Sequence, residues 1–126
     1  MIVGLGVDIV EIDRMKHMLE LHGDRLIERL FTDAEAQYAL SHAEPALHFA
    51  ARVAAKEATY KALAGNPLAR AVGWREIEVC RKDDGAPWLS LHGRAKDRAA
   101  ELEVRHALVS LTHSKTAAVA VVVLER

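Results

Sequence analysis

The stretch ARVAAKEATYKAL, residues 51–63, predicts a helix because it contains five alanines and a leucine and has no proline or glycine. On a helical wheel, Glu57 falls within about 60° of Val53 and Ala54, and Lys61 lies about 40° from it. The Glu57 carboxylate is therefore expected inside the apolar stripe of the helix. A charge in that position is costly unless it is paired or bound to a metal.

Two interpretations of this carboxylate follow. Glu57 and Lys61 have the i,i+4 spacing of a helical ion pair, which contributes about 0.3–0.5 kcal/mol. Alternatively, Glu57 belongs to a functional site, which would need a second group elsewhere in the chain. The spacing alone does not choose between them.

The stretch GLGVDIV, residues 4–10, provides a candidate for that second group. It is apolar and β-branched, which predicts a buried strand, and its alternation places Gly4, Gly6 and Asp8 on one face. Glycines beside a carboxylate leave room for a ligand to approach Asp8. Asp8 is either a cap of the following helix or, with Glu57, a ligand of a hard cation such as magnesium bound to substrate phosphates. Lys61 would then neutralise phosphate charge.

Length and composition limit the class of protein. A chain of 126 residues predicts one domain, residues 1–126, and 51% hydrophobic with 28% charged residues is typical of a soluble globular protein. The net charge of −1 gives no general attraction to nucleic acid. Cys80 is the only cysteine, no apolar run could cross a membrane, and no export signal is apparent, so we expect a cytoplasmic protein.

The order of expected elements is β-α-α-α-β-β-α-β-β. A helix is expected from Glu11 to about residue 21, where Gly23 ends it, and a second helical stretch follows. A capping box formed by Thr32 and Glu35 predicts the start of another helix, and Pro45 permits the start of the alanine-rich helix. Four further strands, expected in residues 76–82, 88–93, 106–113 and 117–125, form two hairpins that flank a helix in 94–104. This order predicts an α+β fold with a mainly antiparallel sheet and helices packed on it. The last strand is apolar without alternation, which hints at an oligomer.

Five stretches together resemble one known family. They are GLGVDIVEIDR (4–14), RLFTDAEAQY (29–38), ARVAAKEATYKAL (51–63), DDGAP (83–87) and VSLTHSKTAAVAVVV (109–123). In this order, over nearly the whole chain, they resemble holo-acyl-carrier-protein synthase, the small 4′-phosphopantetheinyl transferase family of bacteria. The resemblance implies the phosphopantetheinyl transferase fold.

The resemblance also implies a reaction. Such enzymes transfer the 4′-phosphopantetheine group of coenzyme A to a serine hydroxyl of apo-acyl carrier protein and release adenosine 3′,5′-bisphosphate, with Mg²⁺, in support of fatty acid biosynthesis. Asp8 and Glu57 match the metal-binding acids, and Lys61 matches a lysine that contacts phosphate. Glu57, Lys61 and His113 match catalytic positions. Either Glu57 or a metal-held water accepts the serine proton, and His113 acts as base, hydrogen-bond donor or positioning group.

The resemblance further assigns binding residues and an assembly. The positions implied for coenzyme A are Arg52, Lys61, Gly85, Pro87 and His113. Those implied for the acidic carrier protein are Arg14, Met18 and Arg25. On the helical wheel, Arg14, Met18 and Leu21 lie on one stripe of the helix, and Arg25 extends this stripe if the helical path resumes after Gly23. Members of this length are homotrimers, with the coenzyme A site between neighbouring subunits.

Two departures from the family pattern stand out. The glycine turn of the family usually reads G-K-P, whereas this chain has Gly85-Ala86-Pro87; a missing phosphate contact could be replaced by Arg52, Lys56, Arg81 or Lys82. Ser114 follows His113 where some relatives carry an acid. Two rival functions also remain at this point: a non-catalytic trimeric module that binds carrier protein or nucleotide, and a metal-dependent phosphohydrolase.

Overall fold

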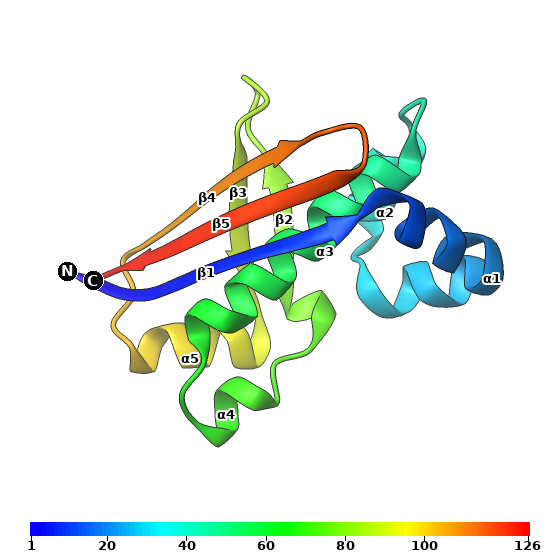
Figure 1. Cartoon of the computed structure of the whole chain (residues 1–126). Helices are drawn as coiled ribbons and strands as arrows, with labels where there is room; N and C mark the ends of the chain where they lie inside the picture. The colour runs from blue at the N-terminus through cyan, green and yellow to red at the C-terminus, as the bar shows by residue number, and fades with distance from the viewer.

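Three antiparallel strands, in the order β1-β5-β4, form the sheet that dominates the fold (Figure 1). The computed structural model describes residues 1–126. Its elements in chain order are β1 Ile2–Glu11, α1 Ile12–Leu30, α2 Asp33–Leu40, α3 Pro45–Leu63, α4 Pro67–Arg70, the 3₁₀ turn η1 Trp74–Glu76, β2 Ile77–Arg81, β3 Pro87–Leu91, α5 Gly93–Glu101, β4 His106–His113 and β5 Ala117–Glu125. The expected α+β class with antiparallel pairing is confirmed.

Helix α3 packs along one face of this sheet, and two glycines of β1 allow the close contact. A Cβ atom added at Gly4 would collide with the carbonyl oxygen of Ala62, and one added at Gly6 with that of Ala58. The glycines are therefore needed for the approach of the helix backbone to the strand. Their expected purpose, an open path for a ligand to Asp8, is replaced by this packing requirement.

The opposite face of the sheet carries apolar side chains that nothing covers in the single chain. On β1, Leu5, Val7 and Ile9 are 66%, 56% and 61% exposed, and their cross-strand neighbours on β5 are also valines. The prediction that the first strand is buried is therefore wrong for one of its two faces. β1 is an edge strand, and α3 covers only the face that carries Gly4 and Gly6.

The β2–β3 hairpin forms a separate two-stranded sheet instead of joining the three-stranded one. Gly85 turns this hairpin with a φ of 87°, a conformation that favours glycine. The short helix α4 and η1, which the sequence analysis did not predict, lie between α3 and β2. They carry the chain back along α3 (Figure 1).

The helices before α3 begin and end largely where the sequence predicts. Gly23 interrupts α1 with φ 51° and ψ −131°, so the helix axis changes direction there. Thr32 caps α2: its side chain accepts from the Glu35 backbone, and the Glu35 side chain accepts from the Thr32 backbone, which confirms the capping box. Pro45 is the first residue of α3, as predicted. No helix is both long enough and apolar enough to span a bilayer.

Two charged residues lie in the core beside α3. Lys56, with 1% of its surface exposed, forms an ion pair with Glu35 of α2 at 2.8 Å and donates to the carbonyl oxygens of Trp74 and Ile77. The second oxygen of Glu35 accepts from the Val79 backbone at 2.9 Å. Both partners are thus hydrogen-bonded, as buried charges require. Lys56 is therefore not free to contact a coenzyme A phosphate, and that alternative is wrong.

Candidate active site

Asp8 and Lys61 are brought together by the packing of β1 on α3. Lys61 Nζ lies 3.0 Å from Asp8 Oδ1 and donates to the Val7 carbonyl at 2.9 Å. Lys61 thus pairs with the acid on the strand and not with Glu57 one turn away on its own helix. The i,i+4 interpretation of Glu57 and Lys61 is wrong, and so is the interpretation of Asp8 as a helix cap, because α1 begins without a side-chain cap at Glu11.

Glu57 faces the same region. Burial raises the pKa of the Glu57 carboxyl, the nearby Asp8 carboxylate raises it further, and Lys61 partly opposes both effects. Two carboxylates from distant parts of the chain therefore sit close enough to repel each other, with one lysine for the two. No group of three or more His, Cys, Asp or Glu residues surrounds them that could hold a metal by protein ligands alone.

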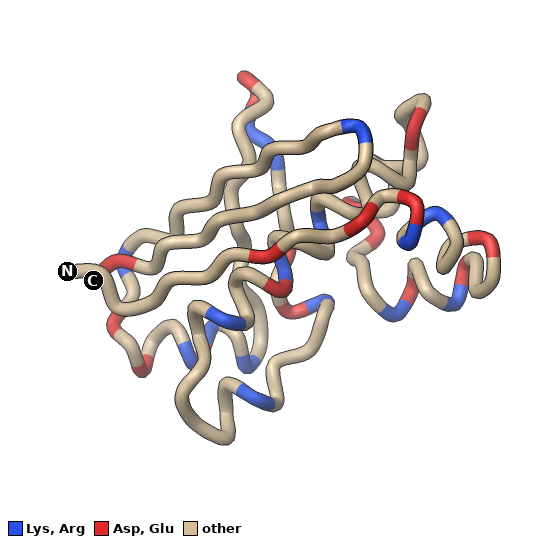
Figure 2. Tube along the Cα trace, in the orientation of Figure 1, with Lys and Arg blue, Asp and Glu red and all other residues tan.

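A cleft of about 650 Å³ connects these acids to helix α1. Its walls include Asp8 and Glu57 together with Arg14 and Met18, the residues predicted to contact a carrier protein. Arg25 is not among the lining residues; Arg29 is, because the kink at Gly23 breaks the stripe that a continuous helix would have formed. Charged residues are concentrated on this side of the cleft: Figure 2 shows that α1 carries many Lys, Arg, Asp and Glu residues, whereas the strands of the sheet carry few.

A second group of predicted site residues lies around the ring of Tyr38. The Cζ atoms of Arg52 and Arg81 lie 4.2 Å and 5.4 Å from the ring centroid, and Arg81 Nη1 donates to the Gly85 carbonyl at 2.7 Å. The buried Nε atoms of both arginines have no hydrogen-bond partner. Orphaned guanidinium donors side by side, without an acid to pair them, are suited to an anionic ligand.

Histidines extend this Tyr38 cluster. The His42 and His48 rings are 4.2 Å apart, and the pKa of His48 is lowered by burial and then by His42, Arg52, Arg81 and His113. Arg52 itself is only 1% exposed, so a ligand could reach it only if Tyr38 or His48 moved. Arg81 is the more accessible of the two guanidinium groups. Pro87 pairs with Arg81 across the β2–β3 hairpin and so belongs to the same region.

His113 stands at the end of β4, beyond the cleft that holds the acids. It is exposed, and its Nδ1 lies 3.4 Å from the Ser114 carbonyl. It lines a cavity of about 880 Å³ with the first turns of α1 and the start of α3, whereas the acids line a different one. Within one chain, His113 is therefore not in the same cleft as Asp8 and Glu57.

The two groups of residues lie on different sides of α3. Arg52 and Glu57 are five residues apart, which on a helix is about 140° of rotation and about 7.5 Å of rise. The Asp8, Glu57 and Lys61 group consequently faces β1 and α1, and the Tyr38 cluster faces α2 and the β2–β3 hairpin. Sequence reasoning missed Tyr38, His48, Arg29 and Trp74. Of these, Tyr38 and Arg29 lie inside the quoted stretch 29–38, but no spacing marks them as site residues.

The geometry belongs to a known class of enzyme. The model of the 4′-phosphopantetheinyl transferase superfamily matches residues 4–122. The chain belongs to this superfamily and is an enzyme of the holo-[acyl-carrier-protein] synthase type, as its relatives indicate. The protein of that name from Maridesulfovibrio salexigens is 43% identical over 126 residues, covering 100% of both chains, and that from Geobacter sulfurreducens is 44% identical, covering 100% of this chain and 99% of the other.

Solved structures agree with this assignment. The holo-[acyl-carrier-protein] synthase of Neisseria meningitidis superimposes with a TM-score of 0.87 at 25% identity, covering 100% of both chains. The synthase of Bacillus anthracis, solved in complex with coenzyme A (3′,5′-ADP), gives a TM-score of 0.77 at 36% identity, covering 98% of this chain and 96% of the other. The predicted family and fold are confirmed.

Proposed function

We propose that this enzyme transfers the 4′-phosphopantetheine group of coenzyme A to a serine hydroxyl of apo-acyl carrier protein, releases adenosine 3′,5′-bisphosphate, and thereby supports fatty acid biosynthesis. The observation that carries the proposal is the meeting of Asp8 and Glu57, with Lys61, in a cleft that also reaches Arg14 and Met18. Two acids and a lysine are suited to a metal–pyrophosphate complex, and the adjoining α1 surface is suited to a protein that brings the serine.

The chemistry of the donor set fits Mg²⁺. Magnesium is usually held by one or two carboxylates and by substrate phosphates, so two acids suffice. The raised pKa of Glu57 fits as well, because a cation between Glu57 and Asp8 would relieve their repulsion. Asp8 and Glu57 would hold the ion, which would neutralise charge on the pyrophosphate and on the leaving bisphosphate.

The chain's own residues would then orient the reactants. Lys61, which is half exposed, would turn from Asp8 to the pyrophosphate when coenzyme A binds. The serine oxygen forms a bond to the β-phosphorus, the bond from that phosphorus to the bridging oxygen breaks, and the bisphosphate leaves with the electron pair. The serine proton would pass to Glu57 or to a water molecule.

The Tyr38 cluster would hold the nucleotide end of coenzyme A. Arg81 offers a partly exposed guanidinium, and Arg52 lies behind it, so these two residues would replace the lysine missing at Ala86. Gly85 and Pro87 would border the same site, and His113 would contact the pyrophosphate from the end of β4. The Tyr38 cluster and the acids face different sides of α3. We therefore place the complete site between neighbouring subunits of a homotrimer, where one subunit supplies the acids and its neighbour supplies the Tyr38 cluster.

The exposed apolar face of the sheet supports this assembly. Leu5, Val7 and Ile9 form a continuous patch with valines of β5, and such a patch usually marks an interface. The carrier protein would bind the α1 surface through Arg14 and Met18, with Arg25 further along the helix. We expect the enzyme to act in the cytoplasm, as its single cysteine suggests.

Mass spectrometry of the carrier protein tests the proposed function. The enzyme is incubated with apo-acyl carrier protein, coenzyme A and Mg²⁺, and the carrier should gain the mass of one phosphopantetheinyl group. A carrier variant in which the acceptor serine is alanine should gain nothing. An unchanged mass of the wild-type carrier after long incubation would overturn the proposal, whereas consumption of coenzyme A without modification of the carrier would favour hydrolysis.

A further inference from the structure

Three rings pack together beside the buried guanidinium of Arg52. The His42 and His48 ring centroids lie 4.2 Å apart, and the Tyr38 ring centroid lies 4.4 Å from the first and 5.5 Å from the second. Arg52 lies against the same Tyr38 ring, with 4.2 Å between its Cζ atom and the ring centroid. We call Tyr38, His42 and His48 the ring stack. Both histidines are partly exposed, whereas the arginine is buried, so the stack covers the arginine.

The backbone holds this ring stack in place. Nδ1 of His42 lies 2.6 Å from the Tyr38 carbonyl, and Arg52 Nη1 donates to the His48 carbonyl at 3.2 Å. A carbonyl oxygen can only accept, so Nδ1 of His42 carries the proton of its bond. Neither ring nitrogen of His48 has a hydrogen-bond partner in the chain. The His48 imidazole is therefore free to gain a proton.

The charges around His48 oppose its protonation in the free protein. Burial lowers the pKa of the His48 imidazole, and His42, Arg52, Arg81 and His113 lower it further. These neighbours come from the α2–α3 turn, α3, β2 and β4, and each of them is a cation or is able to become one. His48 is consequently neutral near pH 7, where an uncharged ring packs beside the arginines without repulsion.

No carboxylate compensates for these cations. None of the ion pairs in the structure includes either histidine of the ring stack. Glu35 of α2 is paired with Lys56 in the core. The cavity between α1 and the start of α3 has charged residues of both signs in its wall, but the ring stack does not line it; they are Asp13, Lys16, Glu20, Glu44 and Lys115. The Tyr38 cluster therefore has an excess of positive charge.

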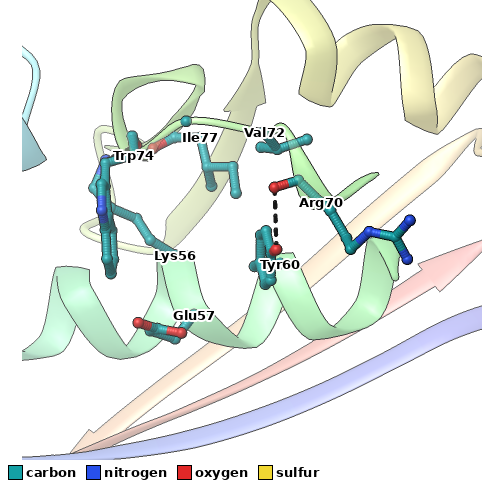
Figure 3. Close-up of a pocket in the computed structure, with 8 residues that line it drawn as sticks. Lys56, Glu57, Tyr60, Arg70, Val72, Trp74 and Ile77 are labelled. Carbon is teal, nitrogen blue, oxygen red and sulfur yellow. Dashed lines mark hydrogen bonds between the residues drawn. The ribbon is translucent and has the colours of Figure 1, made fainter. Parts of the chain in front are cut away.

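The other side of α3 offers an anion no comparable group of cations. Figure 3 shows the pocket between α3 and the segment from α4 to β2, from which the Arg70 side chain extends away. The Lys56 ammonium in its wall is bound to a core carboxylate and to two backbone carbonyls. Lys61 is paired with Asp8. Without a bound metal, an anionic phosphate is therefore attracted most strongly to the Tyr38 cluster.

We propose, on the basis of the proposed function, that His48 takes up a proton when an anionic phosphate binds at the Tyr38 cluster, so that acid strengthens this binding. The phosphate supplies the negative charge that the cluster lacks, and so favours the imidazolium form of His48. The proton comes from solvent, and no covalent bond of the ligand changes. Repulsion from Arg52 and Arg81 moves the charged ring out of the stack, which uncovers Arg52 and turns an N–H toward the phosphate. Because binding and protonation are linked, each strengthens the other.

Calorimetric titration with adenosine 3′,5′-bisphosphate, without Mg²⁺, tests this linkage. Titrations in two buffers of different ionisation enthalpy give the number of protons taken up with the ligand. The wild-type enzyme should take up protons on binding and should bind the bisphosphate about fivefold more tightly at pH 6.5 than at pH 8.0. His48→Phe keeps an aromatic ring in the stack but cannot gain a proton, so its uptake should be smaller and its affinity should depend less on pH. The phosphate groups of the ligand titrate alike with both proteins, so the difference between the proteins reports on His48.

His22→Gln is the matched control, because His22 is an exposed histidine of α1 outside the ring stack, and this variant should behave as the wild type. His48→Gln also removes the titrating ring, and it provides the measurement if His48→Phe does not fold. Equal proton uptake by the wild type and the folded His48 variant overturns the inference, and so does failure of the wild type to bind the bisphosphate. A wild-type enzyme that binds the bisphosphate with proton uptake but modifies no carrier refutes the proposed function instead.

Discussion

Lys61 of α3 forms its ion pair with Asp8 of β1, with 3.0 Å between Nζ and Oδ1, and leaves Glu57 on its own helix without that partner. The pair is partly exposed, and exposed ion pairs contribute only about 0–1 kcal/mol. Lys61 can therefore leave Asp8 at little cost when a cation and a pyrophosphate arrive. Under the proposed function, Lys61 must turn away from Asp8 before a cation can bind there.

Removing the charge of Asp8 should slow transfer strongly, with little effect on the fold. Asp8→Asn keeps the shape of the side chain but removes the negative charge that would bind the cation. We expect a loss of about 3 kcal/mol in transition-state stabilisation, which corresponds to a rate about 100-fold lower. Initial rates of carrier modification measure this effect at several Mg²⁺ concentrations. Asp97→Asn, at an exposed acid of α5 that lines neither the acid cleft nor the cavity of His113, is the control and should retain the wild-type rate. A near-normal rate for Asp8→Asn would contradict the metal assignment.

Glu57 should make activity depend on pH. Since its pKa is raised by burial and by Asp8, transfer should fall as the pH drops through that pKa and the carboxyl gains a proton. Mg²⁺ binds the ionised form, so higher Mg²⁺ should move this acid limb of the pH–rate profile to lower pH. Profiles recorded at low and saturating Mg²⁺ measure the shift. An acid limb that does not respond to Mg²⁺ would argue that another group titrates.

The same raised pKa predicts an effect on stability. A carboxyl whose pKa is higher in the folded than in the unfolded state loses stability as the pH rises between the two values, because its ionised form opposes folding. Glu57→Gln should therefore raise the melting temperature slightly at neutral pH, while abolishing activity. The gain should vanish in acid, where wild-type Glu57 is protonated. Glu20→Gln, at an exposed position of α1, should give no such pattern.

The buried pair of Lys56 and Glu35 should be essential for folding. Lys56→Met leaves the Glu35 carboxylate in the core without its cation, and loss of one partner of a buried pair costs about 3–5 kcal/mol. Chemical denaturation measures the free energy of unfolding. Lys82→Met, at an exposed lysine, is the control and should change it by less than about 0.5 kcal/mol. A small effect of Lys56→Met would mean that Glu35 is neutral in the folded protein.

Local patterns in the sequence predicted most of the elements because these depend on near neighbours. The capping box at Thr32, the start of α3 at Pro45 and both hairpins rest on interactions within a few residues. The short helix α4 and η1 carry too few residues to show any periodicity, so they were not predicted. The separate sheet of the β2–β3 hairpin was not predictable either, because it depends on which strand edges meet in three dimensions.

The site was predictable in its residue types but not in its grouping. Asp8 and Glu57 could be named because a carboxylate is unexpected on an apolar stripe or beside glycines. The same reasoning could not distinguish Lys56, which is buried with Glu35, from Lys61, which is half exposed. Nor could it reveal that Arg52 and Glu57 face neighbours on different sides of α3, or that the apolar face of β1 is exposed to solvent in the single chain. Each of these facts depends on contacts between segments far apart in the chain.

Charge reversal on α1 should weaken binding of the carrier protein selectively. Arg14 lines the catalytic cleft beside Met18, so Arg14→Glu should repel an acidic carrier and raise its KM at least tenfold. The KM for coenzyme A should stay unchanged, and the wild-type KM for the carrier should rise with salt, because salt screens the attraction. Lys16→Glu reverses a charge on the same helix but outside this cleft. If both variants weaken the carrier equally, general charge and not this surface governs docking.

The open apolar face of the sheet should hold the subunits together. Leu5, Val7 and Ile9 lie opposite the face that α3 covers, and three copies of this patch around one axis would remove them from water. Light scattering should give three times the chain mass of 13.9 kDa. Val7→Asp places a charge in the patch and should yield monomers that lose transfer, since each would hold only half of a site. Glu103→Gln, at an exposed residue outside the strands, should remain trimeric and active. Full activity of a monomeric Val7→Asp variant would show that one chain contains a complete site.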